Sequence, residues 1–313
     1  MPPSSTSEPA PAPLPRRKPR LPLEPFAATA AIIWGSSYPA TQIALRGLSP
    51  FAAGFWRTLV GLVFLALVSF GFGASPIHPR RLRLAQWWRL SLLSLLSTAI
   101  FLTFLNLSIQ QAGPVMAAFL VTTYPVFALL LAPWVVHEPV LPRRTVAALV
   151  SIGGAFLLLG GSHSLGGQAS AQAVLGGGLG LGASLSFALY LVLTRRWTHA
   201  FDLDARTIAF FSPVFSAPVM LPLALLAGHG GLGINRLDSG LAVLWLGILC
   251  SGLAYLAMNH SLRRGQASRS SMPLLLAPVV ASLLSWLILG VHLSALQWLG
   301  AAISLAGMFA ANL

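Results

Sequence analysis

The sequence predicts an all-α membrane protein whose ten transmembrane helices form two five-helix repeats of inverted topology. Three observations lead to this prediction: the composition, ten long apolar segments and an internal repeat. Of the 313 residues, 56% are hydrophobic and 8% are charged, whereas about 25% of the residues in an average soluble domain are charged. Together with a mean hydropathy of +0.79, this composition excludes a soluble globular protein and a disordered chain.

Ten apolar segments have the length, about 20 residues, that a helix needs to cross the hydrocarbon core of a bilayer. We expect helices because every backbone N–H and C=O in hydrocarbon must find a partner within the protein. The alternation of apolar and polar residues that is typical of barrel strands is absent. The predicted helices are 26–45, 51–72, 89–109, 114–136, 144–161, 173–194, 207–227, 241–262, 269–290 and 294–312.

These helices divide the chain into a tail and two repeats. Residues 1–25 are rich in Pro, Ser and Ala, and we expect them to form a disordered cytoplasmic tail. The tail is basic, as in a signal peptide, but the apolar segment after it is too long and precedes many further spans. We therefore interpret that segment as a retained first helix. The repeats are expected at 26–161 and 173–313.

The Lys and Arg residues predict the orientation of the helices. All but three of the 19 lie in the tail or in and beside the loops after the second, fourth, sixth and eighth helices. The exceptions are Arg46 and Arg236, in loops on the opposite side, and Arg57, within the second helix. Because cytoplasmic loops collect Lys and Arg, both termini are expected in the cytoplasm. The net charge of +13 then reflects membrane topology, and we expect no nucleic-acid partner.

The two halves of the chain are related by an offset of 153 residues. At this offset, 106–160 aligns without a gap on 259–313, and Asn106 matches Asn259. Five helices in each half would force the second half to insert upside down. Such inverted repeats are a transporter architecture, in which two bundles rock around a site near the bilayer midplane.

The charges of the matched loops change as this inversion requires. Gln110 and Gln111 lie in a loop expected outside, whereas their matches, Arg263 and Arg264, lie in a loop expected inside. A receptor or a structural membrane protein has no need of such an arrangement. The charges therefore strengthen the hypothesis of a transporter.

Several motifs resemble an EamA-type member of the drug/metabolite transporter superfamily. They are WGSSYP at 34–39, GLSP at 47–50, FWR at 55–57, YPVF at 124–127 and LRRGQAS at 262–268. The resemblance implies ten helices in two inverted halves, with a central cavity lined mainly by helices 1, 3, 4, 6, 8 and 9. It also implies a bacterial inner-membrane exporter of small metabolites, often amino acids. In place of the acidic residue usual after helix 9 stands Gly290-Val-His292, which leaves the role of Glu138 open.

Polar and aromatic side chains within the predicted helices are the candidates for a substrate site, because polar groups in hydrocarbon usually face the bundle interior. We expect a site that is walled by aromatic side chains and floored by two amides, with Arg57 on its outer side. The alternative for each residue is packing or helix–helix hydrogen bonding. The candidate substrate-binding residues are Trp34, Ser37, Tyr38, Arg57, Asn106, Tyr124, Tyr190, Tyr255, Asn259 and Trp286.

Arg57 has two interpretations at this stage. A guanidinium binds a carboxylate through two parallel hydrogen bonds, so Arg57 could clamp a substrate or form a gate. The alternative is a structural role, in which the long side chain reaches the interface or binds carbonyls of a neighbouring helix. The sequence alone leaves both open.

The sequence predicts a transporter that exports a small metabolite, such as an amino acid, by alternating access. None of the six acids lies in a predicted span, so no carboxylate stands out as a proton carrier. Alternatives are a multidrug, organic-cation or sugar-type permease of the same fold and, from other classes, a channel or a membrane-embedded enzyme. An enzyme is disfavoured because the seven His are scattered without ligand spacing. The expected partners are a small-molecule substrate and the lipid bilayer, with a homodimer left open, and no cofactor or metal is expected.

Overall fold

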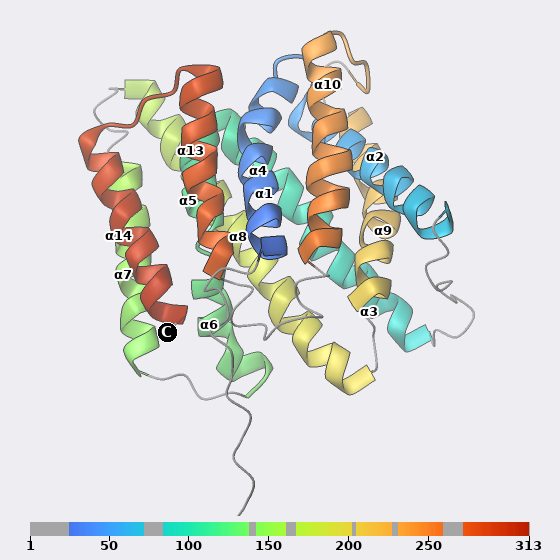
Figure 1. The fold of residues 1–313 in the computed structure, drawn as a ribbon, viewed down its shortest axis with the longest axis horizontal. Coiled ribbons are helices and arrows are strands. Elements are labelled where there is room, and N and C mark those ends of the chain that lie inside the picture. The colour runs from blue at the N-terminus through green and yellow to red at the C-terminus, as the bar shows by residue number, and fades with distance from the viewer. Residues whose placement is uncertain are drawn as a thin grey trace, which may run out of the picture.

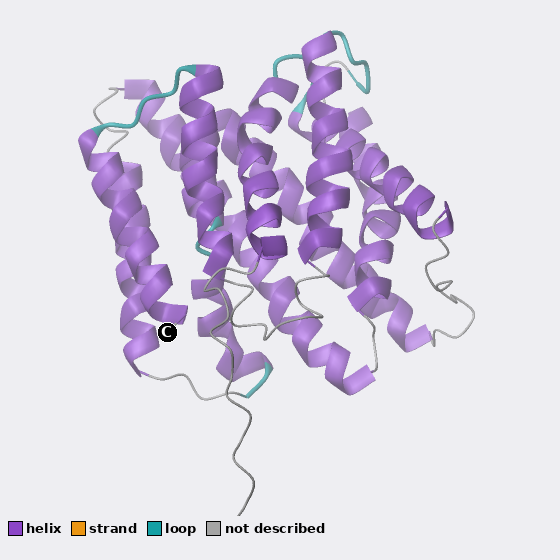
Figure 2. Ribbon diagram, in the orientation of Figure 1, coloured by secondary structure: helices purple, strands orange, loops and turns teal. Residues whose placement is uncertain are grey.

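The structure is a computed structural model that describes residues 25–71, 84–137, 142–160, 167–201, 205–226, 231–258 and 272–312. Within these ranges the chain is helical with short connections and contains no strand (Figure 2). This finding confirms the predicted all-α class. Apart from Pro25, the expected tail lies outside the described residues, and so does Glu138.

The helices run side by side in one bundle (Figure 1). In the first half they are α1 (Pro25–Ala44), α2 (Pro50–Gly71), α3 (Leu84–Ser94), the π-helix η2 (Leu95–Ile100), α4 (Phe101–Ala112), α5 (Pro114–Val121), α6 (Tyr124–Val135) and α7 (Pro142–Gly160). In the second half they are α8 (Gly167–Phe201), α9 (Ala205–Leu226), α10 (Leu237–Trp245), the π-helix η4 (Leu246–Leu253), the 3-10 helix η5 (Met272–Leu275), α13 (Leu276–Leu289) and α14 (Ala295–Asn312).

Proline fixes the first residue of four of these helices. Pro25, Pro50, Pro114 and Pro142 begin α1, α2, α5 and α7. At this position the missing N–H costs nothing, because the first N–H groups of a helix have no partner within it, and the fixed φ of proline suits the helix. Gly113, with a φ of 83°, makes the sharp turn between α4 and α5.

Three of the predicted helices are interrupted in the structure, and in the one predicted at 241–262 the π-helix η4 follows α10. The segment predicted at 89–109 belongs to a longer rod, Leu84–Ala112, in which η2 replaces about one turn of α-helix. The segment predicted at 114–136 is divided into α5 and α6 at Thr122 and Thr123, whose hydroxyls donate to the carbonyls of Ala118 and Leu120. Pro125 follows directly and cannot donate a helical hydrogen bond, so the backbone bonding is interrupted here.

Five helices in the described ranges are long and apolar enough to cross a membrane: Pro50–Val68, Leu84–Ala112, Pro114–Val135, Ala171–Trp197 and Leu237–Met258. Three shorter apolar helices are Phe210–Leu226, Leu276–Leu289 and Ala295–Ala310. Large apolar side chains on the outer faces of α7, α13 and α14 are more than half exposed, among them Phe156, Leu287 and Leu299. Exposed apolar side chains on the outer faces of these helices are suited to contact with lipid.

Helices α7 and α14 pack most closely, at one edge of the bundle (Figure 1). The hydroxyls of Ser151 and Ser304 lie 3.4 Å apart. A Cβ on Gly154 would lie 2.8 Å from the Cα of Ser304, and a Cβ on Gly307 would lie 2.5 Å from the backbone nitrogen of Ser151. The contact is therefore reciprocal, with each glycine against the serine of the other helix.

The connections lie at the two ends of the bundle. The α1–α2 and α13–α14 connections and the start of α10 lie at the upper end in Figure 1, and the end of α14 lies at the lower end. At the upper end, the carboxylate of Asp238 accepts two hydrogen bonds of 3.0 Å from Arg236, and its Oδ2 lies 3.9 Å from Arg46. These ion pairs join the first connection to the start of α10.

Candidate functional site

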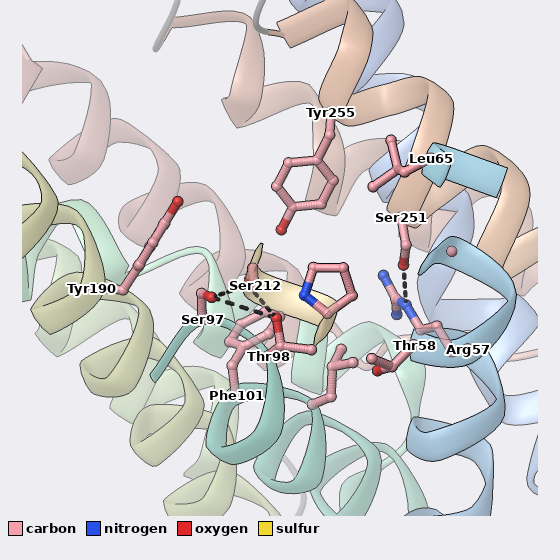
Figure 3. A pocket seen from close by; sticks show the side chains of 13 residues that line it. Arg57, Thr58, Leu65, Ser97, Thr98, Phe101, Tyr190, Ser212, Ser251 and Tyr255 are labelled. Atoms are coloured by element: carbon pink, nitrogen blue, oxygen red, sulfur yellow. Dashed lines mark hydrogen bonds between the residues drawn. The ribbon is translucent and has the colours of Figure 1, made fainter. Parts of the chain in front are cut away.

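A small polar pocket lies inside the bundle, where α2, η2, α4, α8, α9 and the helix that contains η4 meet (Figure 3). Its volume of about 50 Å³ is far below the roughly 300–1,000 Å³ of a typical ligand pocket. In this structure the pocket is therefore too small to hold a ligand of that size. The polar side chains that line the pocket are Arg57, Thr58, Ser97, Thr98, Tyr190, Ser212, Ser251 and Tyr255.

Two π-helices supply hydroxyl groups to the pocket from the two halves of the chain. Thr98 lies in η2 and Ser251 lies in η4, and the two residues are separated by the repeat offset of 153. π-Helical turns are rare in proteins as a whole, but those that do occur are often found at functional sites. The two π-helices therefore bring matched positions of the two halves to one pocket.

A cluster of hydroxyl groups connects η2 with α9. The hydroxyl of Ser212 lies 2.7 Å from that of Ser97 and 2.8 Å from that of Thr98. One turn away, Ser94 and Ser216 bind each other at 2.7 Å, and Ser216 also donates to the Ser94 carbonyl. Because a hydroxyl both donates and accepts, the three that line the pocket can reorient toward a ligand.

Arg57 is the charged group of the pocket. Its side chain is 6% exposed, and its Nε donates a 3.0 Å hydrogen bond to the hydroxyl of Ser251 (Figure 3). Its Nη1 is buried and has no hydrogen-bond partner. In the described part of the chain, Asp238 is the one acidic residue, and it is bound to Arg236 at the end of the bundle. A buried guanidinium with a free N–H is suited to an anionic ligand.

Aromatic side chains extend the pocket wall. The ring of Tyr255 lies 5.4 Å from that of Trp34 in an edge-to-face arrangement, and the indole N–H of Trp34 donates to the carbonyl of Cys250. On the other side, Tyr190 and Tyr124 both pack against Phe187, at 5.5 and 5.0 Å. Figure 3 shows the Tyr255 hydroxyl directed toward the pocket between Tyr190 and Arg57.

The structure thus brings three of the ten candidate residues, Arg57, Tyr190 and Tyr255, into the pocket lining. Trp34 contacts the ring of the lining residue Tyr255, whereas Tyr124 lies further out, against Phe187, which packs on Tyr190. Tyr38 and Ser37 are buried in α1, and the Ser37 hydroxyl donates to the carbonyl of Trp34.

The remaining candidates lie elsewhere or are not described. Asn106 is buried, and its amide donates a 2.8 Å hydrogen bond to the carbonyl of Pro50 at the start of α2. Trp286 is 50% exposed on α13, beside the exposed Leu287 and Leu283. Asn259 lies outside the described residues.

Sequence reasoning did not single out most of the hydroxyl groups of the pocket. Ser97, Thr98, Ser212 and Ser251 are missing from the candidate site, although the offset of 153 pairs Thr98 with Ser251. Extending the repeat before Asn106 would have identified this pair. Among the described residues, no three His, Cys, Asp or Glu side chains gather closely enough to hold a metal ion.

Comparison with protein families gives a match that covers most of the chain. The model of the EamA-like transporter family matches residues 23–160 and again residues 174–313. The sequence resemblance to EamA-type transporters is thereby confirmed.

Curated relatives extend over nearly the whole chain at low identity. An uncharacterized transporter of Archaeoglobus fulgidus is 24% identical over 90% of this chain and 94% of its own length. The uncharacterized transporter YdfC of Bacillus subtilis is 24% identical over 88% and 86%. A probable terminal-alkyne amino-acid exporter of Streptantibioticus cattleyicolor is 24% identical over 90% of each chain. A solved crystal structure with 19% identity superposes with a TM-score of 0.66, covering 92% of this chain and 97% of the other, which shows a shared fold.

Proposed function

Because the chain belongs to the EamA-like transporter family, we propose that it exports a small metabolite, such as an amino acid, by alternating access. The pocket around Arg57 carries this proposal. It is buried among helices of both halves, holds one uncompensated guanidinium and is lined by hydroxyl and phenol groups. One relative is named a probable terminal-alkyne amino-acid exporter, which supports a substrate that carries a carboxylate.

The proposal includes ten transmembrane helices in two inverted repeats, at 26–161 and 173–313. The double match of one family model supports two related halves. So do the π-helices η2 and η4, which begin at Leu95 and Leu246, near the repeat offset. The contact of α7 with α14 supports a local two-fold relation. Under a two-fold axis, if Gly154 contacts Ser304, its counterpart Gly307 contacts Ser151 in the same way, as is observed.

The bacterial inner membrane, with cytoplasmic termini, is the proposed location. Figure 1 shows the end of α1 and the start of α10 at the upper end of the bundle, and Arg46 follows α1 whereas Arg236 precedes α10. The starts of α3 and α7 and the end of α8 lie at the lower end, and these segments contain a larger set of arginines. That set is Arg89, Arg143, Arg144, Arg195 and Arg196. The excess of arginine supports a lower end that faces the cytoplasm, which is the end of α14.

Alternating access explains why the pocket is small. A pocket of about 50 Å³ cannot hold a small metabolite unless the helices around it separate. In an inverted-repeat transporter, one bundle rocks against the other and opens the site to one side at a time. In such a cycle, the small pocket belongs to a step at which the helices around the site lie close together.

Counterflow tests the proposal. Purified protein is reconstituted into liposomes that are preloaded with one unlabelled amino acid or other small carboxylate, and uptake of the same labelled compound is measured. We expect saturable uptake that is accelerated by the preloaded compound. Uptake that rises linearly with concentration and is not accelerated would indicate a channel, and the absence of uptake for every compound would count against the transporter proposal.

A further inference from the structure

We propose that the transported substrate is a net anion whose anionic group binds Arg57, and that the membrane potential drives its export without a coupled proton. This inference rests on the proposed function, which it narrows from amino acids in general to compounds with a net negative charge, and it adds the source of energy. Three observations support it: the positive charge of the pocket, the Nη1 of Arg57 that has no hydrogen-bond partner, and the lack of proton-exchanging groups in the described lining.

The pocket has a fixed positive charge. A guanidinium stays protonated in proteins, and the other polar groups in the described lining are neutral hydroxyls and phenols. A substrate with one net negative charge therefore neutralises the pocket. A zwitterion would leave its ammonium group without a carboxylate partner in the described lining, and a cation would add to the positive charge.

The hydrogen bonding of Arg57 leaves its Nη1 group available to a ligand. Ser251 accepts the Nε hydrogen bond at 3.0 Å and so fixes the plane of the guanidinium, whereas the buried Nη1 has no partner. A buried N–H of a charged group gains strongly from an ionised acceptor. The hydroxyls of Ser97, Thr98 and Ser212, which now bind one another, can donate to further oxygens of the substrate.

The described lining contains no group that exchanges a proton near neutral pH. It holds no Asp, Glu or His, and the described His137 and His292 lie in the connections that follow α6 and α13. A cycle that carries one anion outward and returns empty therefore moves one negative charge out of the cell. With the interior negative, a potential of 100 mV favours this movement by about 50-fold in concentration.

Three compounds that differ mainly in charge test the inference. N-acetyl-leucine is an anion, leucine is a zwitterion and leucinamide is a cation, and the same three forms of phenylalanine and threonine vary the side chain. Each labelled compound is enclosed at equal concentration inside and outside proteoliposomes, and valinomycin with a potassium gradient sets a potential of about 100 mV, interior negative. The final distribution is measured, because it does not depend on the orientation of the reconstituted protein.

We expect the N-acetyl amino acids to leave the vesicles toward a ratio of about 50-fold, to enter when the potential is reversed, and to move equally with and without a pH gradient. Transport of leucine or leucinamide in preference to N-acetyl-leucine, or a final distribution that ignores the potential, would overturn the inference while counterflow still supported a transporter. If no compound of the three series moves in counterflow, the proposed function fails as well.

Matched variants assign the effect to Arg57. Arg57→Gln should lower the rate of anion transport at least tenfold, whereas Arg57→Lys, which keeps the charge, should retain more of it. Arg46→Gln removes the same charge at the exposed end of the bundle and should change the rate less than twofold. If Arg57→Gln does not fold, Ser251→Ala replaces it, and its KM for the anion should rise while that for any slowly transported zwitterion does not. An equal rise in the KM for the anion and in the KM for the zwitterion would contradict the inference.

Discussion

The contact between α7 and α14 and the pocket around Arg57 both join residues 153 positions apart, but they use this relation differently. At the first, Ser151 and Ser304 touch across a contact so close that Gly154 and Gly307 have no room for a Cβ. At the second, Thr98 and Ser251 line a cavity from π-helices. Small residues in α-helices bring backbones together, whereas π-turns break the regular surface and leave polar groups free to bind.

This comparison assigns different consequences to substitutions in the two regions. Changes in the close contact should affect stability, because small residues at membrane helix interfaces allow the van der Waals packing that holds helices together. Changes in the pocket should affect transport, because hydroxyls there can change partners. The following predictions test this separation, from the largest expected effect to the smallest.

Gly154→Ala should destabilise the protein by about 1–3 kcal/mol, as overpacking of a filled core does. The new Cβ would lie 2.7 Å from the carbonyl oxygen of Gly300 and would also meet the backbone of Ser304. The neighbouring Gly153→Ala is the control, because nothing lies within 4 Å of its Cβ position. Thermal unfolding in detergent should show a lower midpoint for the first variant alone, and equal midpoints would contradict the close contact.

Ser212→Ala should weaken substrate binding by roughly tenfold to a hundredfold, because it removes a hydroxyl that can donate to the substrate and leaves a substrate oxygen without that partner, at about 1–3 kcal/mol. Ser212 binds both Ser97 and Thr98. In the control Ser282→Ala, the lost hydroxyl donates to the Pro278 carbonyl of its own helix and to no other group in the described part of the chain. The KM for transport should rise for Ser212→Ala and stay constant for Ser282→Ala; a shift in thermal stability without a change in KM would indicate a packing role.

Asn106→Ala should cost about 0.6 kcal/mol of stability, the average for a side-chain hydrogen bond between membrane helices, and should leave the KM unchanged. The reason is that the Asn106 amide binds the carbonyl of Pro50 and is absent from the described pocket lining. Transport at matched amounts of folded protein checks this. A tenfold rise in KM would restore Asn106 to the substrate site, as the sequence predicts.

The helices could be predicted from the sequence because apolar runs of about 20 residues leave few alternatives in a membrane. Arg57 could be singled out as a candidate for a related reason, since a lone charge in an apolar segment usually faces the interior, but its role stayed open. Trp286 shows the limit of this reasoning. A soluble helix reveals its inner face through polar residues on the outer face, whereas Trp286 lies on an apolar helix whose outer, half-exposed face is apolar too.

The pocket hydroxyl groups were not predictable from the sequence, and the reason is a different one. A serine in a membrane helix can bond a carbonyl of its own helix, as Ser37 does, or project to a neighbour, as Ser97 does. Which of the two occurs depends on the direction in which the local helical turn points the serine side chain. The π-helices η2 and η4 change the register of the side chains, and no residue type in the sequence marks a π-turn.

Substrate protection of Thr98 tests most directly whether the pocket is the transport site. Thr98→Cys is made in a Cys250→Ala background, which removes the single native thiol, and the rate of modification by a small thiol reagent is measured in proteoliposomes. Ser294→Cys in the α13–α14 connection is the control. We predict that a compound transported in counterflow slows modification of Thr98→Cys at least threefold, and that it leaves Ser294→Cys unaffected. Equal rates at Thr98→Cys with and without the transported compound would contradict the assignment of the site.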